Sequence, residues 1–190
     1  MDRINIKKQA RVALSANYWQ VMFFTFIPSI IISIVGPTVI FSIFATPLIV
    51  GGMYGLWQLY NLRPTTTNDL GRGYQQPHLI RNFVQIVLAV VFIFLWSLLL
   101  VIPGIIKSYS YILVPFLLAD PDVQEEDVIT LSRKMMDGHK WELFVLQLSF
   151  LGWAILGLFT LNILNIFYTA PYYQLSLAGF YQVRKESFQG

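Results

Sequence analysis

The chain has 190 residues, of which 56% are hydrophobic and 12% are charged, and its mean hydropathy is +0.59. Soluble domains carry about 25% charged residues, so this composition excludes an ordinary soluble domain. The net charge of +3 forms no basic patch of the kind that binds nucleic acid, and the lack of cysteine excludes disulfide bonds, thiol nucleophiles and thiolate metal sites.

Three long segments are almost free of charge. Residues 12–62 and 143–183 contain no Asp, Glu, Lys or Arg, and residues 82–119 contain only Lys107. As continuous helices they would measure roughly 75, 60 and 55 Å at about 1.5 Å per residue, and each could cross a ~30 Å hydrocarbon core twice. The sequence therefore predicts an all-α, polytopic membrane bundle of about six transmembrane helices arranged as three hairpins, with spans over residues 18–35, 38–60, 82–101, 104–119, 142–160 and 165–183.

This division predicts a single integral membrane domain over residues 1–190 and leaves no segment for a separate soluble domain. The parts differ in charge, and they alternate between apolar hairpins and polar connections. In chain order we expect a basic interfacial helix (1–17), hairpin 1 (18–60), a cytoplasmic loop (61–81), hairpin 2 (82–119), a cytoplasmic amphipathic helix (120–140), hairpin 3 (141–183) and a tail (184–190).

The N-terminal segment predicts a helix with one basic face. Arg3, Lys7 and Arg11 recur at four-residue spacing, and an apolar strip runs beside them from Ile6 to Ala13. Such a helix can lie on the anionic inner leaflet, where each basic residue adds about 1 kcal/mol, so these residues are candidate contacts for lipid or a partner. The alternative is a basic tail that only fixes topology. A cleaved signal peptide would begin similarly, but the apolar run continues without a clear cleavage site.

Positive charges gather on one side of the predicted hairpins. They occur in both termini and both longer loops. The opposite turns, near Gly36-Pro37, near Pro103-Gly104 and around residues 160–165, are short and carry no charge apart from the nearby Lys107. Because Lys and Arg are retained on the cytoplasmic side of a membrane, both termini and both longer loops should face the cytoplasm.

Lys107 is the one basic residue within a predicted span. A charge at the bilayer centre costs about 2.5–3.5 kcal/mol on insertion scales and marks a candidate site. Its long side chain could instead reach water or a lipid phosphate at the nearby outer boundary. Lys107 is therefore either a binding or partner contact, or a residue that snorkels without specific function.

Prolines fall inside the second helix of each predicted hairpin. Pro47, Pro115 and Pro171 each free a backbone carbonyl, so we expect them to kink these helices or to shape their packing. Pro47 and Pro171 are each followed eight residues later by a glycine, Gly55 and Gly179. This match indicates either a duplicated hairpin or coincidence.

Several aromatic residues lie near the ends of the predicted helices. Amphipathic rings at such positions favour the depth of the lipid headgroups. We therefore expect an interfacial role for Tyr18, Trp19, Tyr60, Trp141 and Tyr181.

The segment after the second hairpin carries the signals of an amphipathic helix over residues 120–138. Asp120 can cap it, and acidic residues as far as Asp127 crowd the positive end of the helix dipole. Apolar residues recur at helical spacing from Val128 onward, and Gly138 can end the helix. The acidic cluster could instead bind a divalent cation, but its place at a helix start already explains it.

Six short stretches have the order and spacing of a known family. They are NDLGRGY (68–74), LLLVIPGIIKSYSY (98–111), TLSRKMMDGHKW (130–141), QLSFLGW (147–153), APYY (170–173) and AGFY (178–181). Together they resemble the bacterial integral membrane family catalogued as domain of unknown function 975. The resemblance implies a multi-pass protein found mainly in Gram-positive bacteria and supplies no catalytic residues. The family's loop motif usually has Asp-Leu-Phe, and Gly71 stands in place of that Phe here.

The predicted spans carry no group for acid-base or metal chemistry. Apart from Glu142, the first residue of the span 142–160, they contain no Asp, Glu or His, and His78 and His139 lie in loops without a second ligand at helical spacing. An intramembrane enzyme would need a carboxylate pair, a metal-binding helix, or a base beside a nucleophile. We therefore predict no catalytic, metal-binding or cofactor-binding residue, and a protein that is not an enzyme.

These expectations favour a non-catalytic multi-pass protein of the bacterial cell membrane, with both termini cytoplasmic, that acts by contact. Its partners would be membrane lipids, or another membrane or peripheral protein, in envelope maintenance, stress response or antimicrobial-peptide resistance; we expect no nucleic acid partner. The alternative is a transporter or permease, or a subunit of an exporter, for a small or lipophilic substrate, because repeats and broken helices occur in that class.

Overall fold

The computed structural model describes residues 3–35, 39–74, 79–99, 101–123 and 127–189, with the backbone alone over 32–35, 39–46, 97–99, 101–103 and 189. These residues form helices and no strand, which confirms the all-α prediction. In chain order the helices are α1 (Arg3–Ala16), α2 (Tyr18–Val35), α3 (Val39–Tyr60), the 3₁₀-helix η1 (Thr67–Tyr74), α4 (Leu79–Leu99), α5 (Val101–Tyr111), α6 (Val114–Ala119), α7 (Val128–Met135), α8 (Lys140–Leu148), α9 (Leu151–Phe159), the π-helix η2 (Asn165–Thr169) and α10 (Ala170–Gln189).

The first hairpin agrees with the prediction in its helix boundaries. α2 covers the predicted span 18–35, and α3 begins one residue after the start of the predicted span 38–60. Pro47 lies inside α3, as expected. The predicted turn at Gly36-Pro37 lies outside the described residues.

The second hairpin differs from the prediction. The turn expected at Pro103-Gly104 is wrong, because both residues belong to α5. A proline is tolerated in the first turn of a helix, where the N–H groups have no helical acceptor. The predicted span 104–119 is also broken, since α5 ends at Tyr111 and α6 begins at Val114. Pro115 lies in the first turn of α6, so it starts a new helix instead of kinking a continuous one.

The third hairpin is interrupted twice. The predicted span 142–160 is divided between α8 and α9, and the predicted span 165–183 begins as the π-helix η2 before it continues as α10. Pro171 is the second residue of α10 and lies just after the π-helical turn, within a helical run that is continuous over residues 163–189. The segment predicted as a tail, 184–190, continues α10 as far as Gln189.

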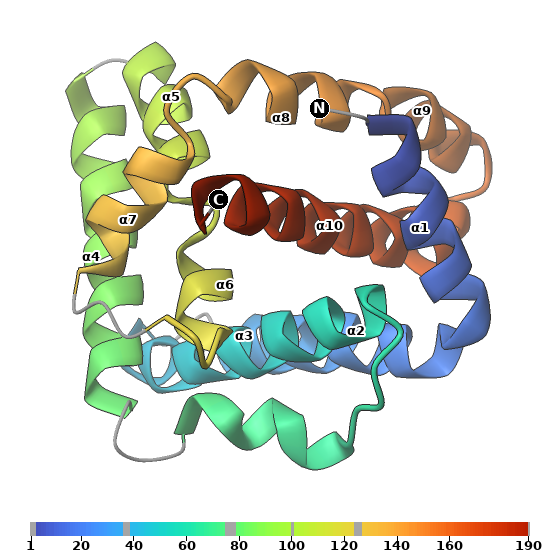
Figure 1. Ribbon diagram of the computed structural model, residues 1–190, viewed down its shortest axis with the longest axis horizontal. Coiled ribbons are helices and arrows are strands. Elements are labelled where there is room, and N and C mark those ends of the chain that lie inside the picture. The colour runs from blue at the N-terminus through green and yellow to red at the C-terminus, as the bar shows by residue number, and fades with distance from the viewer. Residues whose placement is uncertain (1–2, 36–38, 75–78, 100, 124–126, 190) are drawn as a thin grey trace.

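The helices do not all run along one direction. In Figure 1, α3, α10 and the α8–α9 pair run across the view, whereas α4 runs upright beside their ends. The core gathers where α10 and α6 pack on α3, around buried side chains that include Leu56, Phe116, Tyr172 and Tyr181. Among the described residues, two helical stretches, Leu79–Trp96 and Lys140–Phe159, are long and apolar enough to cross a membrane.

The loop motif NDLGRGY forms η1, which packs tightly against α3. A Cβ atom at Gly51 would clash with the backbone carbonyl of Leu70, and one at Gly73 would clash with that of Pro47. The buried Asn82 amide also donates to the carbonyl of Gly73, at 3.1 Å. The two backbones approach closely because glycines stand at both contacts. Gly71 is exposed, and a Cβ atom there would have nothing within 4 Å, so an aromatic side chain would point away from the protein.

The prediction of a helix over residues 120–138 is wrong at its start. Asp120 follows the last turn of α6, and α7 begins only at Val128. The side chain of Asp127 caps it by accepting a hydrogen bond from the Thr130 N–H, at 3.0 Å. The expected apolar face of α7 is buried, and Gly138 has a φ of 73°, which suits a residue that follows a helix.

Replacing Asp127 with alanine should lower the free energy of unfolding by about 1 kcal/mol, because it removes the cap of α7. The bonds from Thr130 lower the pKa of the Asp127 carboxyl below its usual 3.8. The stabilisation is therefore present above pH 3.8 and is lost as the pH falls through the folded-state pKa. Chemical denaturation in mild detergent at several pH values measures both effects. Asp127→Ser, which retains a capping oxygen, is the control and should stay within a few tenths of a kcal/mol of the unmodified chain.

The predicted interfacial aromatics divide into two groups. Trp19 and Trp141 are 81% and 71% exposed, which suits rings at headgroup depth. Tyr60 and Tyr181 are buried in the core, so the interfacial prediction is wrong for them. Tyr18 is half-buried, and its hydroxyl donates to the carbonyl of Phe167 at 2.9 Å.

Candidate functional site

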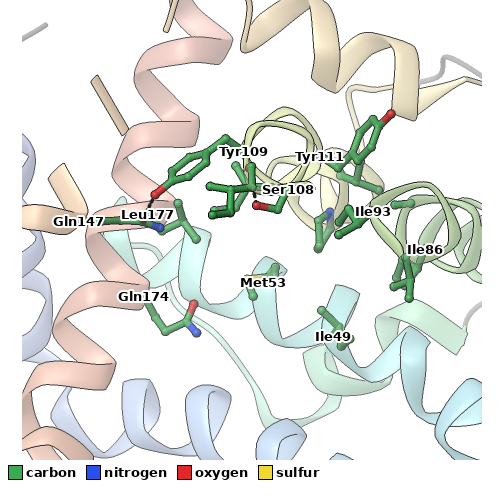
Figure 2. A pocket seen from close by; sticks show the side chains of 16 residues that line it. Ile49, Met53, Ile86, Ile93, Ser108, Tyr109, Tyr111, Gln147, Gln174 and Leu177 are labelled. Atoms are coloured by element: carbon green, nitrogen blue, oxygen red, sulfur yellow. Dashed lines mark hydrogen bonds between the residues drawn. The ribbon is translucent and has the colours of Figure 1, made fainter. Parts of the chain in front are cut away.

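A cavity of about 560 Å³ lies among α3, α4, α5, α6 and α10. α4 contributes Ile86, Ala89 and Ile93, which share one face because they recur at helical spacing. Met53 of α3 and Leu177 of α10 line other walls, and Figure 2 shows these side chains around the hollow. The break between α5 and α6 also borders it, since Pro115 lines the cavity.

A chain of hydrogen bonds closes one side of the cavity. The Tyr109 hydroxyl donates to the Gln147 side-chain carbonyl, and the Gln147 amide donates to the Tyr173 hydroxyl at 2.6 Å. Figure 2 shows Tyr109 and Gln147 meeting at the edge of the hollow. A second hollow of about 500 Å³, between α8–α9 and the start of α10, is lined by Gln147 and Tyr173. The three side chains thus stand between two apolar spaces.

A smaller hollow of about 90 Å³ adjoins the first cavity on the side of α2. The two share Ile49, Met53 and Gln174 as wall residues, and Thr25 lines the smaller one. The side-chain carbonyl oxygen of Gln174 and the hydroxyl oxygen of Thr25 are buried and have no hydrogen-bond partner within the described part of the chain. Figure 2 shows Gln174 extending from α10 toward Met53.

The lining of these three hollows determines what they can bind. It is mainly apolar, and its polar members are neutral amides and hydroxyls; over the described ranges of the chain, it includes no Asp, Glu, His, Lys or Arg. The described residues also contain no group of three or more His, Cys, Asp or Glu that could hold a metal ion. The arrangement suits an uncharged apolar molecule, and the volume of the first cavity falls within the usual range of ligand pockets, about 300–1,000 Å³.

Lys107 does not line the cavity. Its ammonium lies 4.6 Å from the centre of the Trp96 ring, across the α4–α5 hairpin. An ammonium over an indole ring contributes about 0.5–1 kcal/mol at an exposed site. The contact gives Lys107 a local partner, which supports the interpretation without a specific function.

Lys107→Met is expected to change the free energy of unfolding by less than about 1 kcal/mol, because only the contact with Trp96 is lost. Growth of the variant strain under envelope stress should match that of the parent strain. Dose–response curves with membrane-active peptides measure the growth of the two strains. A sensitivity equal to that of a deletion strain would instead assign Lys107 a binding role.

The basic residues of α1 face the protein more than expected. The apolar strip that includes Ile6 and Ala10 is buried, as predicted for an amphipathic helix, but it packs on α10 and α3 and not on a lipid surface. Lys7 donates to the Ser149 hydroxyl at 3.0 Å and lies 4.3 Å from the centre of the Phe150 ring. Burial, with the nearby charge of Arg11, lowers the pKa of Lys7 below its usual value.

The other two residues of the predicted basic face remain available to solvent or lipid. Arg3 and Arg11 are exposed, and the guanidinium of Arg11 lies 5.7 Å from the centre of the Tyr172 ring. The predicted basic face is therefore divided, with Lys7 turned into the contact between α1 and the third hairpin. Of the predicted proline positions, Pro115 borders the cavity, Pro47 faces η1, and Pro171 starts α10.

A buried ionic cluster, which the sequence pattern did not predict, joins the end of α6 to the end of α10. The side chain of Asp120 is 0% exposed; it accepts a hydrogen bond from the Tyr181 hydroxyl at 2.5 Å and pairs with Lys185 at 2.5 Å. Lys185 also donates to Asp122, at 2.8 Å, and lies 5.0 Å from the centre of the Trp57 ring. Burial alone would lower the pKa of Lys185, but the bonds to the two carboxylates raise it above its usual value.

The sequence carries one weak indication of this cluster. Asp120 and Lys185 each stand at the end of an apolar segment, with opposite charges. Helices that pack side by side could bring such ends together, but nothing local says which ends meet. Of the two histidines, His139 lies beside Glu142, with its Nδ1 atom 3.2 Å from the carboxylate. His78 lies outside the described residues.

Comparison with known proteins identifies a family. The model of the family described as "Protein of unknown function (DUF975)" matches residues 2–187, which is nearly the whole chain. No curated protein and no solved structure matches the chain. The family match agrees with the resemblance carried by the short sequence stretches.

Proposed function

We propose that this chain, which belongs to the DUF975 family, is a non-catalytic, multi-pass protein of the bacterial cell membrane. It acts by contact with lipid or with another membrane or peripheral protein. Its role lies in envelope maintenance, stress response or resistance to antimicrobial peptides.

The observation that carries this proposal is the exposure of its most apolar helices. Only 17% of the residues of Leu79–Trp96 and 22% of those of Lys140–Phe159 are buried. Large apolar side chains such as Phe94, Leu158 and Phe159 are between 62% and 83% exposed. A core helix of a soluble protein would be mostly buried, and an uncovered apolar surface of this extent marks contact with a membrane or a partner. Lipid is the partner that such long, apolar helices suit best.

The topology that we propose has six spans with both termini in the cytoplasm, as the distribution of Lys and Arg favours. Two contacts run against it. Lys7, in the segment assigned to the cytoplasmic interface, donates to Ser149 inside the predicted span 142–160. The hydrogen bond between Tyr18 and Phe167 joins two helix ends that this topology assigns to opposite faces. The turn at Leu161, close to that contact, is therefore the decisive position.

The topology can be tested by cysteine labelling, because the natural chain has no cysteine. Single cysteines at Asn68, Asp137 and Leu161, all exposed, would be treated with a membrane-impermeant maleimide on intact cells. Cys at position 161 should react, whereas positions 68 and 137 should react only after lysis. Labelling of 161 only after lysis would overturn the six-span topology, and recovery of the chain in the soluble fraction after carbonate washing would overturn the membrane location itself.

The cellular role can be tested with a deletion strain and a complemented strain. Exposure to envelope stresses and membrane-active peptides should reveal greater sensitivity on deletion, restored by the gene. Equal growth of the deletion and parent strains under all these stresses would contradict the proposed role.

A transporter for a lipophilic substrate is the second candidate, and the row of hollows on both sides of Gln147 favours it. Flux of a lipophilic dye through vesicles that contain the purified chain tests it. Flux above that of empty vesicles would support transport. Binding without flux supports action by contact.

A further inference from the structure

We propose that the cavity between α3, α4 and α10 binds an uncharged single-chain amphiphile with a hydroxyl headgroup, such as a monoacylglycerol. The hydrocarbon chain occupies the larger hollow, and the headgroup reaches Gln174 and Thr25 in the smaller one. The inference deepens the proposed function, since it rests on a membrane location and names the lipid that the protein contacts.

The walls of the larger hollow require an apolar occupant. Ile86, Ala89, Ile93 and Leu177 line it, and no charged side chain of the described residues does. A charged headgroup buried there would have no counter-charge, and burial of an unpaired charge is strongly unfavourable. The lining therefore selects against phospholipids and fatty-acid anions and in favour of neutral lipids.

The smaller hollow requires a hydrogen-bond donor. The carbonyl oxygen of Gln174 is an acceptor only, and both it and the Thr25 hydroxyl oxygen are buried without a partner among the described residues. A buried acceptor left without a donor is unfavourable, so a hydroxyl group brought by the ligand would satisfy it. Gln147 is a weaker anchor, because its amide already bonds to Tyr109 and Tyr173.

The two volumes match the two parts of such a ligand. The larger hollow, about 560 Å³, has room for a long hydrocarbon chain. The smaller hollow, about 90 Å³, is several times the ~10–15 Å³ that one water needs, so it has room for a hydroxyl-bearing headgroup. Gln174 lies where they meet, because it lines both.

The experiment measures binding of tritiated monooleoylglycerol and of tritiated methyl oleate to the purified full-length chain in detergent. The two probes share one chain length, but methyl oleate has no hydroxyl group. The unmodified chain should bind monooleoylglycerol about tenfold more tightly, which corresponds to about one hydrogen bond. Gln174→Leu should remove this preference and leave the affinity for methyl oleate unchanged. Gln20→Leu, an exposed glutamine, is the matched control and should behave as the unmodified chain.

A second variant tests the larger hollow. Ala89→Trp should fill it and abolish saturable binding of both probes, and thermal unfolding in the same detergent shows whether the variant is folded. If Ala89→Trp does not fold, Ile93→Phe replaces it with the same expected loss. If the filling variant binds the probes as well as the unmodified chain does, the lipid coats the outer surface and the inference is wrong. The inference is also wrong if the unmodified chain shows no saturable binding, or if it binds both probes with equal affinity. These outcomes are separate from the fractionation and labelling results that test the membrane location.

Discussion

Replacing Asp120 with asparagine is expected to lower the free energy of unfolding by about 3 kcal/mol, because it breaks a buried ion pair and leaves one partner behind. The carboxylate of Asp120 is 0% exposed, and the Lys185 side chain is 11% exposed. The expected loss lies at the lower end of the ~3–5 kcal/mol range for such pairs, since Lys185 still bonds to Asp122. Chemical denaturation of the purified chain in mild detergent measures the change.

The neighbouring Asp122 provides the matched control. Asp122 pairs with the same ammonium at 2.8 Å, but its side chain is 68% exposed. Asp122→Asn should therefore destabilise the fold far less than Asp120→Asn does, because solvent screens a surface ion pair. The double variant Asp120→Asn with Lys185→Met should be more stable than Asp120→Asn alone, because no buried charge remains in the cluster and the exposed Asp122 carboxylate is solvated. Equal losses for Asp120→Asn and Asp122→Asn would show that burial does not decide the effect.

The same cluster has a defined pH window. The raised pKa of Lys185 means that its contribution is fully present below its unfolded pKa, near 10.5, and is lost as the pH rises through the folded-state value. The bond from Lys185 lowers the pKa of Asp122, so that contribution is present above 3.8 and is lost as the pH falls through the folded-state value. Stability from these two groups should be constant across the neutral range.

A methyl group at Gly51 or Gly73 is expected to destabilise the fold by about 3 kcal/mol, at the upper end of the usual range for overpacking. At each position the new Cβ would meet a backbone carbonyl, of Leu70 or of Pro47, and backbone cannot turn aside as a side chain can. η1 would have to move away from α3, and the bond from Asn82 to Gly73 would be lost. The free energies of unfolding of Gly51→Ala and Gly73→Ala measure this effect.

Gly71 lies in the same motif and provides the contrast. A Cβ there meets nothing within 4 Å, and the φ angle of Gly71 is not positive, so Gly71→Ala should change stability by no more than about 0.5 kcal/mol. Gly71→Phe should be tolerated equally well by the fold. Destabilisation by Gly71→Ala as large as that by Gly51→Ala would mean that the clash with α3 is not the cause.

The features that could be predicted from the sequence are local. Helix boundaries at Tyr18, Val35 and Tyr60 follow from unbroken apolar runs, and the buried strip of α1 follows from helical spacing. Hydrophobic periodicity says which side of a helix is buried. It does not say which element covers that side. The apolar strip of α1 therefore reads as a lipid-facing surface in the sequence, whereas in the structure it packs on α10.

The features that were missed depend on contacts between distant residues. The break between Tyr111 and Val114 occurs in an apolar run that reads as one helix, because the local pattern is the same on both sides of it. The docking of η1 depends on glycines that lie far apart in the chain, Gly51 and Gly73. The cavity forms where the apolar faces of several helices do not pack against each other. The pattern of a single helix does not show where that happens.

The pairing of α6 with the end of α10 has a consequence for biosynthesis. Asp122 precedes Lys185 by 63 residues, so the ribosome releases the acidic partners well before the ammonium that neutralises them. Until the last helix emerges, the Asp120 carboxylate lacks Lys185 and Tyr181, so we expect it to stay in contact with water. Nascent chains that stop short of Lys185 should consequently be preferred substrates of membrane quality-control proteases.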